Sequence, residues 1–237
     1  MIRTPPVRVL TGGREEVVLF ELGDMAMGLP QLKETALFTV GEYLEFERKA
    51  EERHEFLDGR ILAMAGESDN HGDISMSVAG LLFGQLRGKP CRARTKDTKV
   101  RSGPTLRAGK TRAGLFSYPD VVVICDELEH LDDHKDVIMN PTAIVEVLSE
   151  STESFDRGEK FTRYQTWNPT LQDYLLVSQD RPQVEHFSKQ ADGSWSYRMY
   201  VGLEAAVAIR SIECTLRLAD VYDRVTFESS MSVSPLS

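Results

Sequence analysis

Two runs of the sequence decide the fold: Tyr118-Pro119-Asp120-Val121-Val122-Val123-Ile124 and Ala143-Ile144-Val145-Glu146-Val147-Leu148-Ser149. Nearly continuous apolar runs of this length are typical of strands buried on both faces of a sheet. Each run carries one carboxylate: Asp120 follows a proline, and Glu146 lies among aliphatic residues. Because a buried carboxylate is costly without a partner, the sequence predicts two central strands whose acids both need one.

Two explanations account for these acids. If the strands are neighbours, Asp120 and Glu146 point into one cavity and share a divalent cation, since hard oxygen ligands suit Mg²⁺ or Mn²⁺. Alternatively, each is a buried carboxylate satisfied by an arginine or by backbone N–H groups.

Helices and further strands are expected on both sides of these runs. Apolar residues from His71 to Leu86 recur with the spacing of one helical face, and Asn70 or Asp69 can cap that helix. The other expected elements are a short helix opened by the Thr39/Glu42 capping box, a hairpin or bent strand over 55–64, a strand over 92–100, a helix from Asp156 to about Trp167, strands over 174–177, 184–187 and 195–200, and a terminal element over 216–227. This order predicts an α/β (α+β) fold, a mixed central β-sheet flanked by helices.

The apolar residues of 1–37 recur with no sustained period, so we expect an N-terminal arm or extension there. One domain is expected over 38–228 and a tail over 229–237. No apolar stretch approaches the roughly 20 residues that span a bilayer, and the amino terminus does not resemble a secretory signal, so we expect a cytoplasmic protein. The three cysteines, Cys91, Cys125 and Cys214, have no paired spacing and are expected to be buried free thiols.

The net charge of -9 argues against a surface that coats nucleic acid generally. The segment Arg87–Arg112 is basic instead, with ten Lys or Arg against the single acid Asp97. Two interpretations stay open for it, a phosphate-facing patch and a solvated hairpin. His130 and His134 have a metal-like spacing but lie in a charged run between two strands, so we expect a solvated loop there.

An ordered set of motifs resembles a known family. The set comprises Phe38-Thr39-Val40-Gly41-Glu42-Tyr43-Leu44, His54-Glu55-Phe56-Leu57-Asp58-Gly59, His71 at a helix start, Tyr118-Pro119-Asp120-Val121, Val145-Glu146-Val147-Leu148-Ser149, and Asp156-Arg157-Gly158-Glu159-Lys160 through Tyr164 to Asp173-Tyr174-Leu175-Leu176-Val177. In this order the motifs resemble the Uma-type family of restriction endonucleases within the PD-(D/E)xK nuclease superfamily. The resemblance covers residue 38 to about residue 227 and implies a restriction-endonuclease-like core.

The resemblance implies that Asp120 and Glu146 are metal ligands and that Glu55 is the third acid of the site. The superfamily lysine, two residues after the glutamate, is replaced here by Leu148. Lys160 on the following helix is the expected substitute, the alternative being an ordinary surface lysine.

Two further residues are candidates for holding phosphate. Arg157 is expected to hold a neighbouring phosphate with help from a helix N-terminus. His71 is expected near the site, or else as a capping or core histidine.

The function implied is Mg²⁺- or Mn²⁺-dependent endonucleolytic hydrolysis of DNA, performed by a homodimer. Two other functions stay open. The missing strand lysine and the acidic charge favour a catalytically inactive module that binds nucleic acid or protein. A hydrolase of another phosphate ester is also compatible, because these residue types do not encode the substrate.

Overall fold

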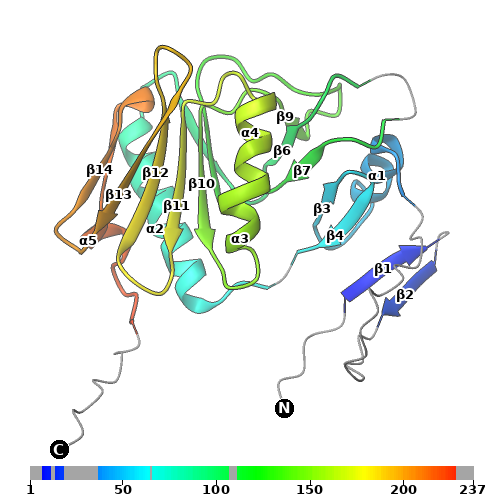
Figure 1. Ribbon diagram of the computed structural model, residues 1–237, viewed down its shortest axis with the longest axis horizontal. Coiled ribbons are helices and arrows are strands. Elements are labelled where there is room, and N and C mark those ends of the chain that lie inside the picture. The colour runs from blue at the N-terminus through cyan, green and yellow to red at the C-terminus, as the bar shows by residue number, and fades with distance from the viewer. Residues whose placement is uncertain (1–6, 12–13, 19–36, 65, 107–110, 228–237) are drawn as a thin grey trace, which may run out of the picture. The chain divides into compact units, whose positions relative to one another are not determined.

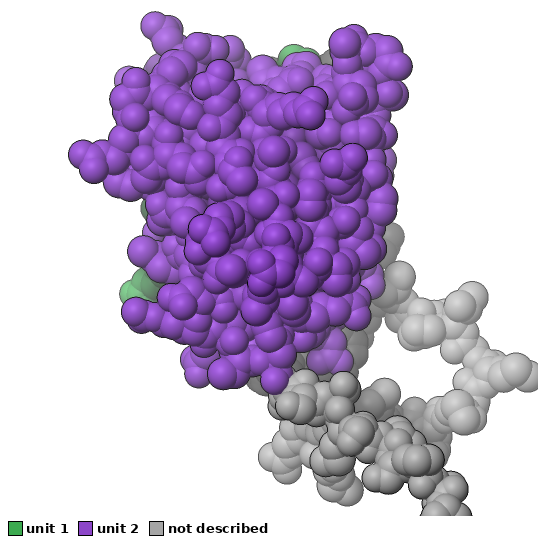
Figure 2. Space-filling view, turned by 90° about the vertical axis from the view of Figure 1, so that its left-hand side faces the viewer, with its two compact units in different colours: residues 1–66, 103–117 green, residues 67–102, 118–237 purple. Residues whose placement is uncertain are grey.

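The computed structural model describes residues 7–11, 14–18, 37–64, 66–106 and 111–227. The chain divides into two compact units, which Figure 2 shows in different colours. One unit comprises residues 1–66 and 103–117, and the other residues 67–102 and 118–237. The expected boundaries near residues 38 and 228 stay predictions, and the tail over 229–237 lies outside the described residues.

The larger unit is built on a six-stranded mixed sheet (Figure 1). Its strand order is β13-β12-β11-β10-β8-β5, with β10 and β11 parallel and every other neighbouring pair antiparallel. The bounds are β5 Arg92–Thr95, β8 Val121–Ile124, β10 Ala143–Leu148, β11 Asp173–Ser178, β12 Gln183–Lys189 and β13 Trp195–Val201. The two apolar runs form β8 and β10, which pair inside the sheet because both of their faces are buried.

Helices cover both faces of this sheet, α2 behind it and α4 in front of it in Figure 1. Helix α2 spans Asp69–Leu86 and packs with Val121, Val123 and Val145 in one hydrophobic cluster. On the opposite face, Val122 and Ile144 pack with Phe161 and Tyr164 of α4. That second layer runs from α3 (Glu153–Phe155) through a π-helical turn (Asp156–Lys160) into α4 (Phe161–Trp167). The predicted mixed sheet flanked by helices is confirmed.

Four more strands of the described part of the larger unit lie outside this six-stranded sheet. Strand β6 (Lys99–Ser102) pairs in parallel with β9 (Val137–Ile138), and β14 (Ala206–Ile209) pairs antiparallel with β15 (Cys214–Arg217), before α5 (Leu218–Val221). No helix in the described ranges is long and apolar enough to cross a membrane.

The smaller unit holds α1 (Val40–Glu47), the antiparallel hairpin of β3 (His54–Leu57) and β4 (Arg60–Ala63), and β7 (Leu115–Ser117), which pairs with β3. The capping box is confirmed: the Thr39 hydroxyl accepts the Glu42 N–H at 3.2 Å, and the Glu42 carboxylate accepts the Thr39 N–H at 2.7 Å. In the expected arm, β1 (Val7–Thr11) pairs antiparallel with β2 (Arg14–Val18), and residues 19–36 lie outside the described residues.

The single strand expected over 92–100 is wrong. A turn in which the Thr98 N–H donates to the Thr95 carbonyl divides it into β5 and β6, which belong to different sheets. The two interpretations of the basic segment stay predictions, and residues 107–110 of it lie outside the described residues. Lys99 and Arg101 are buried, so these two charges do not belong to a solvated face.

The expected cap of one helix and the expected start of another are also wrong. Ser68, rather than Asn70 or Asp69, caps α2, because its hydroxyl accepts the His71 N–H at 3.2 Å. Asp156 does not open a helix, since the helical run already begins at Glu153. The predicted end of this helix near Trp167 is confirmed.

The expectation of free thiols fails for Cys91 and Cys125, which form a disulfide. Cys91 precedes β5 and Cys125 follows β8, and the antiparallel register that pairs Arg92 with Ile124 sets them opposite each other, 3.9 Å apart at Cα. Sequence spacing could not show this, because strand register alone brings the two together. Cys214 is a buried free thiol, as expected.

Candidate active site

Asp120 and Glu146 face each other across two antiparallel strands. The register pairs Val145 of β10 with Val121 of β8. One residue further along, the same register sets Glu146 opposite Asp120. One oxygen of Asp120 accepts the N–H of Val147 at 2.7 Å, which ties the end of β8 to β10. Residues opposite each other in a sheet share a face. The structure therefore brings these two predicted site residues together.

Lys160 joins this pair from the helical layer. Its amine lies 2.9 Å from Glu146 Oε1 and 3.0 Å from Asp156 Oδ1. The exposed fraction is only 5% for Lys160 and 4% for Glu146. The alternative of an ordinary surface lysine is therefore wrong. A lysine that substitutes for the strand lysine must have its amine close to the glutamate, and the Lys160 amine lies beside Glu146.

The turn that carries Lys160 is a π-helix over Asp156–Lys160, with α-helical residues on both sides. Single π-helical turns inside α-helices occur frequently at functional sites. Asp156 and Lys160 lie four residues apart, so the same turn supplies the lysine and its second carboxylate. Leu148, where the superfamily has lysine, is buried in the cluster of this face together with Ile144 and Phe161.

The electrostatics of the cluster are dominated by burial. Burial raises the pKa of Glu146 to about 8, the positive charge of Lys160 opposes that rise, and the negative charges of Asp156 and Asp120 add to it. Burial likewise raises the pKa of Tyr174, whose hydroxyl donates to the Asp156 carbonyl at 3.0 Å. A nearby cation would stabilise the charged form of a carboxylate whose pKa is raised in this way, as that of Glu146 is.

His71 approaches Asp120 from the start of α2. Its Nε2 lies 2.8 Å from the Asp120 oxygen that does not contact Val147. Burial lowers the pKa of His71, but the hydrogen bond and charge of Asp120 outweigh it, so that the pKa is raised overall. The structure thus places His71 beside a proposed metal ligand rather than in the hydrophobic core.

Arg157 is held by two acids. Its guanidinium contacts Glu153 at 2.7 Å and Glu185 at 2.6 Å. It also lies past the start of the helical run, so the expected help from a helix N-terminus is not available at this residue. Its role in holding phosphate stays a prediction.

Glu55 lies on β3 in the smaller unit, whereas Asp120, Glu146 and Lys160 belong to the larger one. Its role as the third acid also stays a prediction. The expected loop at His130–His134 is confirmed, and within the described ranges no group of three or more His, Cys, Asp or Glu side chains is arranged to hold a metal.

The main site residue that sequence reasoning missed is Asp156, which was expected only as the start of a helix. A signal existed, because Asp156 and Lys160 have the spacing of an ion pair on one helical face. Tyr164, whose hydroxyl lies 3.5 Å from Glu146 Oε1, was also overlooked as part of the cluster.

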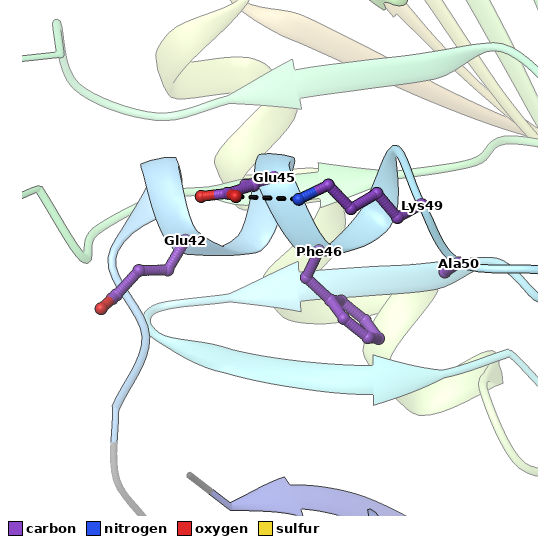
Figure 3. A pocket seen from close by; sticks show the side chains of 5 residues that line it. All are labelled: Glu42, Glu45, Phe46, Lys49 and Ala50. Atoms are coloured by element: carbon purple, nitrogen blue, oxygen red, sulfur yellow. Dashed lines mark hydrogen bonds and ion pairs between the residues drawn. The ribbon is translucent and has the colours of Figure 1, made fainter. Parts of the chain in front are cut away.

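A pocket elsewhere lies on α1 and contains none of the predicted site residues (Figure 3). It is lined by Glu42, Glu45, Phe46, Lys49 and Ala50. Glu45 and Lys49 form an exposed ion pair at 2.9 Å across one helical turn, as Figure 3 shows. Such a pair is an ordinary feature of a solvated helix, so we assign no chemistry to this pocket.

The donor set of the larger unit fits a divalent cation. Mg²⁺ is usually held by one or two carboxylates, with waters and substrate oxygens completing the coordination. Asp120 and Glu146 supply two carboxylates on one face, and Lys160 has Asp156 as an alternative partner if Glu146 turns to a cation.

Comparison with known proteins identifies the family. Residues 40–219 match the family Uma2, described as putative restriction endonuclease. Two uncharacterized proteins of Synechocystis sp. are similar to this chain. The protein slr1290 is 36% identical over 78% of this chain and 92% of its own length, and sll1609 is 34% identical over 73% and 93%.

A solved structure has a similar fold. The crystal structure of a putative nuclease belonging to DUF820 from Anabaena variabilis matches with a TM-score of 0.63 and 15% sequence identity, over 80% of this chain and 99% of that one. At this identity the match concerns the fold alone. Together with the match over residues 40–219, these comparisons establish that the chain belongs to the Uma2 family of putative restriction endonucleases.

Proposed function

We propose that this protein is a metal-dependent endonuclease that hydrolyses phosphodiester bonds of DNA. The observation that carries the proposal is the cluster of Glu146, Asp120 and Lys160, in which the Lys160 amine lies 2.9 Å from Glu146 Oε1. In this proposal the lysine of the helical layer takes over the role of the strand lysine of the superfamily. Membership of a nuclease family supports the reaction class.

In this proposal Asp120 and Glu146 hold Mg²⁺ or Mn²⁺, and Glu55 contributes as the third acid. The bound ion would polarise the scissile phosphate and lower the pKa of a water molecule. Lys160 keeps a positive charge next to the phosphoryl oxygens, where negative charge increases during hydrolysis. His71 orients the Asp120 carboxylate, to which it already lies within hydrogen-bond distance, and contacts phosphate.

Arg157 would have to exchange one of its two carboxylate partners for a phosphate of the substrate. We further propose that the enzyme is cytoplasmic and acts as a homodimer, since symmetric pairs of sites suit cleavage of both strands.

The test is cleavage of supercoiled and linear DNA by purified protein with Mn²⁺ or Mg²⁺. Glu146→Gln and Asp120→Asn should each lower the rate by about a hundredfold or more, because each removes a ligand charge. Glu150→Gln is the matched control, since Glu150 is exposed just beyond β10. Equal rates for Glu146→Gln and the wild type would overturn the proposal.

A second function is favoured by a specific observation. Both oxygens of Asp120 and one oxygen of Glu146 already have protein partners, and Leu148 replaces the strand lysine, as in a module that has kept the fold without catalysis. Calorimetric titration with Mn²⁺ separates the two functions. The nuclease predicts binding that Asp120→Ala abolishes, and the module predicts no binding.

A further inference from the structure

Helix α2 has an exposed face that no part of the described chain covers. Its members recur every three or four residues and are exposed along the whole helix: Asp69, Asp73, Met76, Gly80, Phe83, Gly84 and Arg87, the last being the C-cap. The opposite face of α2 packs on the sheet, as Figure 1 shows.

Two large apolar side chains stand out on this face. The exposed fraction is 70% for Met76 and 65% for Phe83, the two highest values among the exposed large hydrophobic residues of the described chain. They lie two turns apart on one helix, so they form a single stripe. Single exposed apolar residues are common, but a stripe that continues along an element indicates an interaction surface.

Two glycines lie between these side chains. A Cβ atom built on Gly80 or Gly84 would meet nothing within 4 Å, so packing inside the chain does not require a glycine at either position. Neither has the positive φ that favours glycine. Glycine in a helix interior lowers stability relative to alanine, so both positions weaken α2 without an internal reason. Close approach by another backbone or side chain supplies the missing reason.

The charges identify the partner. Asp73 and Arg87 lie seven residues before and seven residues after Gly80. If a second α2 crosses the first antiparallel at Gly80, a two-fold axis sets Asp73 against Arg87 of the partner subunit, twice. The same symmetry sets Met76 against Gly84 of the partner subunit, so that a large side chain meets an open glycine. The face is thus complementary to itself in both shape and charge, as a two-fold interface must be.

We propose that the exposed face of α2 is the surface through which two copies of this chain associate, as an antiparallel helix pair centred on Gly80. A shallow crossing of about 20° keeps residues two turns from the axis within side-chain reach. This proposal does not depend on the proposed catalytic reaction, because it is tested by molecular mass.

Sedimentation equilibrium of the full chain tests it. The wild type should have the mass of a dimer, and Gly80→Arg, which fills the contact, should be monomeric with an unchanged circular dichroism spectrum. Asp73→Lys and Arg87→Glu should each weaken the dimer by about tenfold or more, because like charges then oppose each other. The double variant Asp73→Lys/Arg87→Glu restores the opposite charges and should return the affinity to within a few-fold of the wild type.

Met199→Asp is the matched control. Met199 is an exposed apolar residue on β13, at the edge of the sheet, and its replacement should leave the dimer intact. A monomeric wild type would overturn the proposal. So would a dimer that persists in Gly80→Arg, or one that is lost in Met199→Asp but kept in Gly80→Arg.

Discussion

Lys160 is the residue on which the buried charge cluster depends, because it contacts the carboxylates of both Glu146 and Asp156. Replacing it with methionine keeps most of the side-chain volume but leaves two buried acids without their cation. We expect Lys160→Met to lower the free energy of unfolding by about 3–5 kcal/mol, the usual cost of removing one partner of a buried pair. Urea denaturation followed by the fluorescence of Trp167 and Trp195 measures this loss.

The matched control is Arg217→Met in the same unit. Its guanidinium lies 3.8 Å from Asp220 and its side chain is largely exposed, so the change should alter stability by no more than about 1 kcal/mol. Equal losses in the two variants would show that the Lys160 contacts are energetically ordinary.

Glu146 should make the stability of the metal-free protein depend on pH. Burial raises its pKa from an ordinary value of 4.5 to about 8, so the folded state binds this proton more tightly than the unfolded state does. The resulting stabilisation is fully present below pH 4.5 and is lost as the pH rises through about 8. The free energy of unfolding, measured in chelator from pH 5 to pH 8, should therefore fall more steeply in the wild type than in Glu146→Gln. Parallel curves would contradict the assignment of this titration to Glu146.

At the scale of elements, the start of α2 deserves a direct test because it carries His71. The Ser68 hydroxyl accepts the His71 N–H, so Ser68→Ala should lower the free energy of unfolding by about 1 kcal/mol through loss of the cap. Ser77→Ala, in the middle of the same helix, is the control and should have little effect or a slightly stabilising one. The comparison is made by urea denaturation, and a Ser77→Ala loss as large as that of Ser68→Ala would argue against the cap.

At the scale of the whole molecule, the disulfide joins two distant parts of the chain. Cys91 and Cys125 are 34 residues apart, and closing a loop of that length stabilises the folded state by about 3–4 kcal/mol in the chain-entropy description. The double variant Cys91→Ala/Cys125→Ala should lose about this much in urea denaturation. Thiol titration of the unreduced, denatured wild type should find one thiol, that of Cys214. Three thiols would contradict the pairing.

The same scales explain which predictions from sequence were confirmed. The apolar runs of β8 and β10, the helical face of α2 and the Thr39 capping box depend on residues adjacent or nearly adjacent in the chain. Such patterns are visible in sequence because burial of both faces makes a strand a continuous apolar run, whereas burial of one face gives a helix an apolar period of 3.6. The division of 92–100 into β5 and β6 was missed because one short turn sends the chain to another sheet without disturbing the pattern.

By itself, the sequence determined the fold class, the family, and the presence of Asp120 and Glu146 in two buried apolar strands; that these strands are neighbours was decided by the tertiary structure. Only the tertiary structure decided that Lys160 reaches Glu146, that Asp156 shares that lysine, that His71 contacts Asp120 and that Cys91 pairs with Cys125. The physical reason is the separation along the chain of the residues involved. Periodicity records which face of an element is buried, whereas contacts between elements depend on strand register and on the π-helical turn, which place particular atoms together from distant parts of the chain.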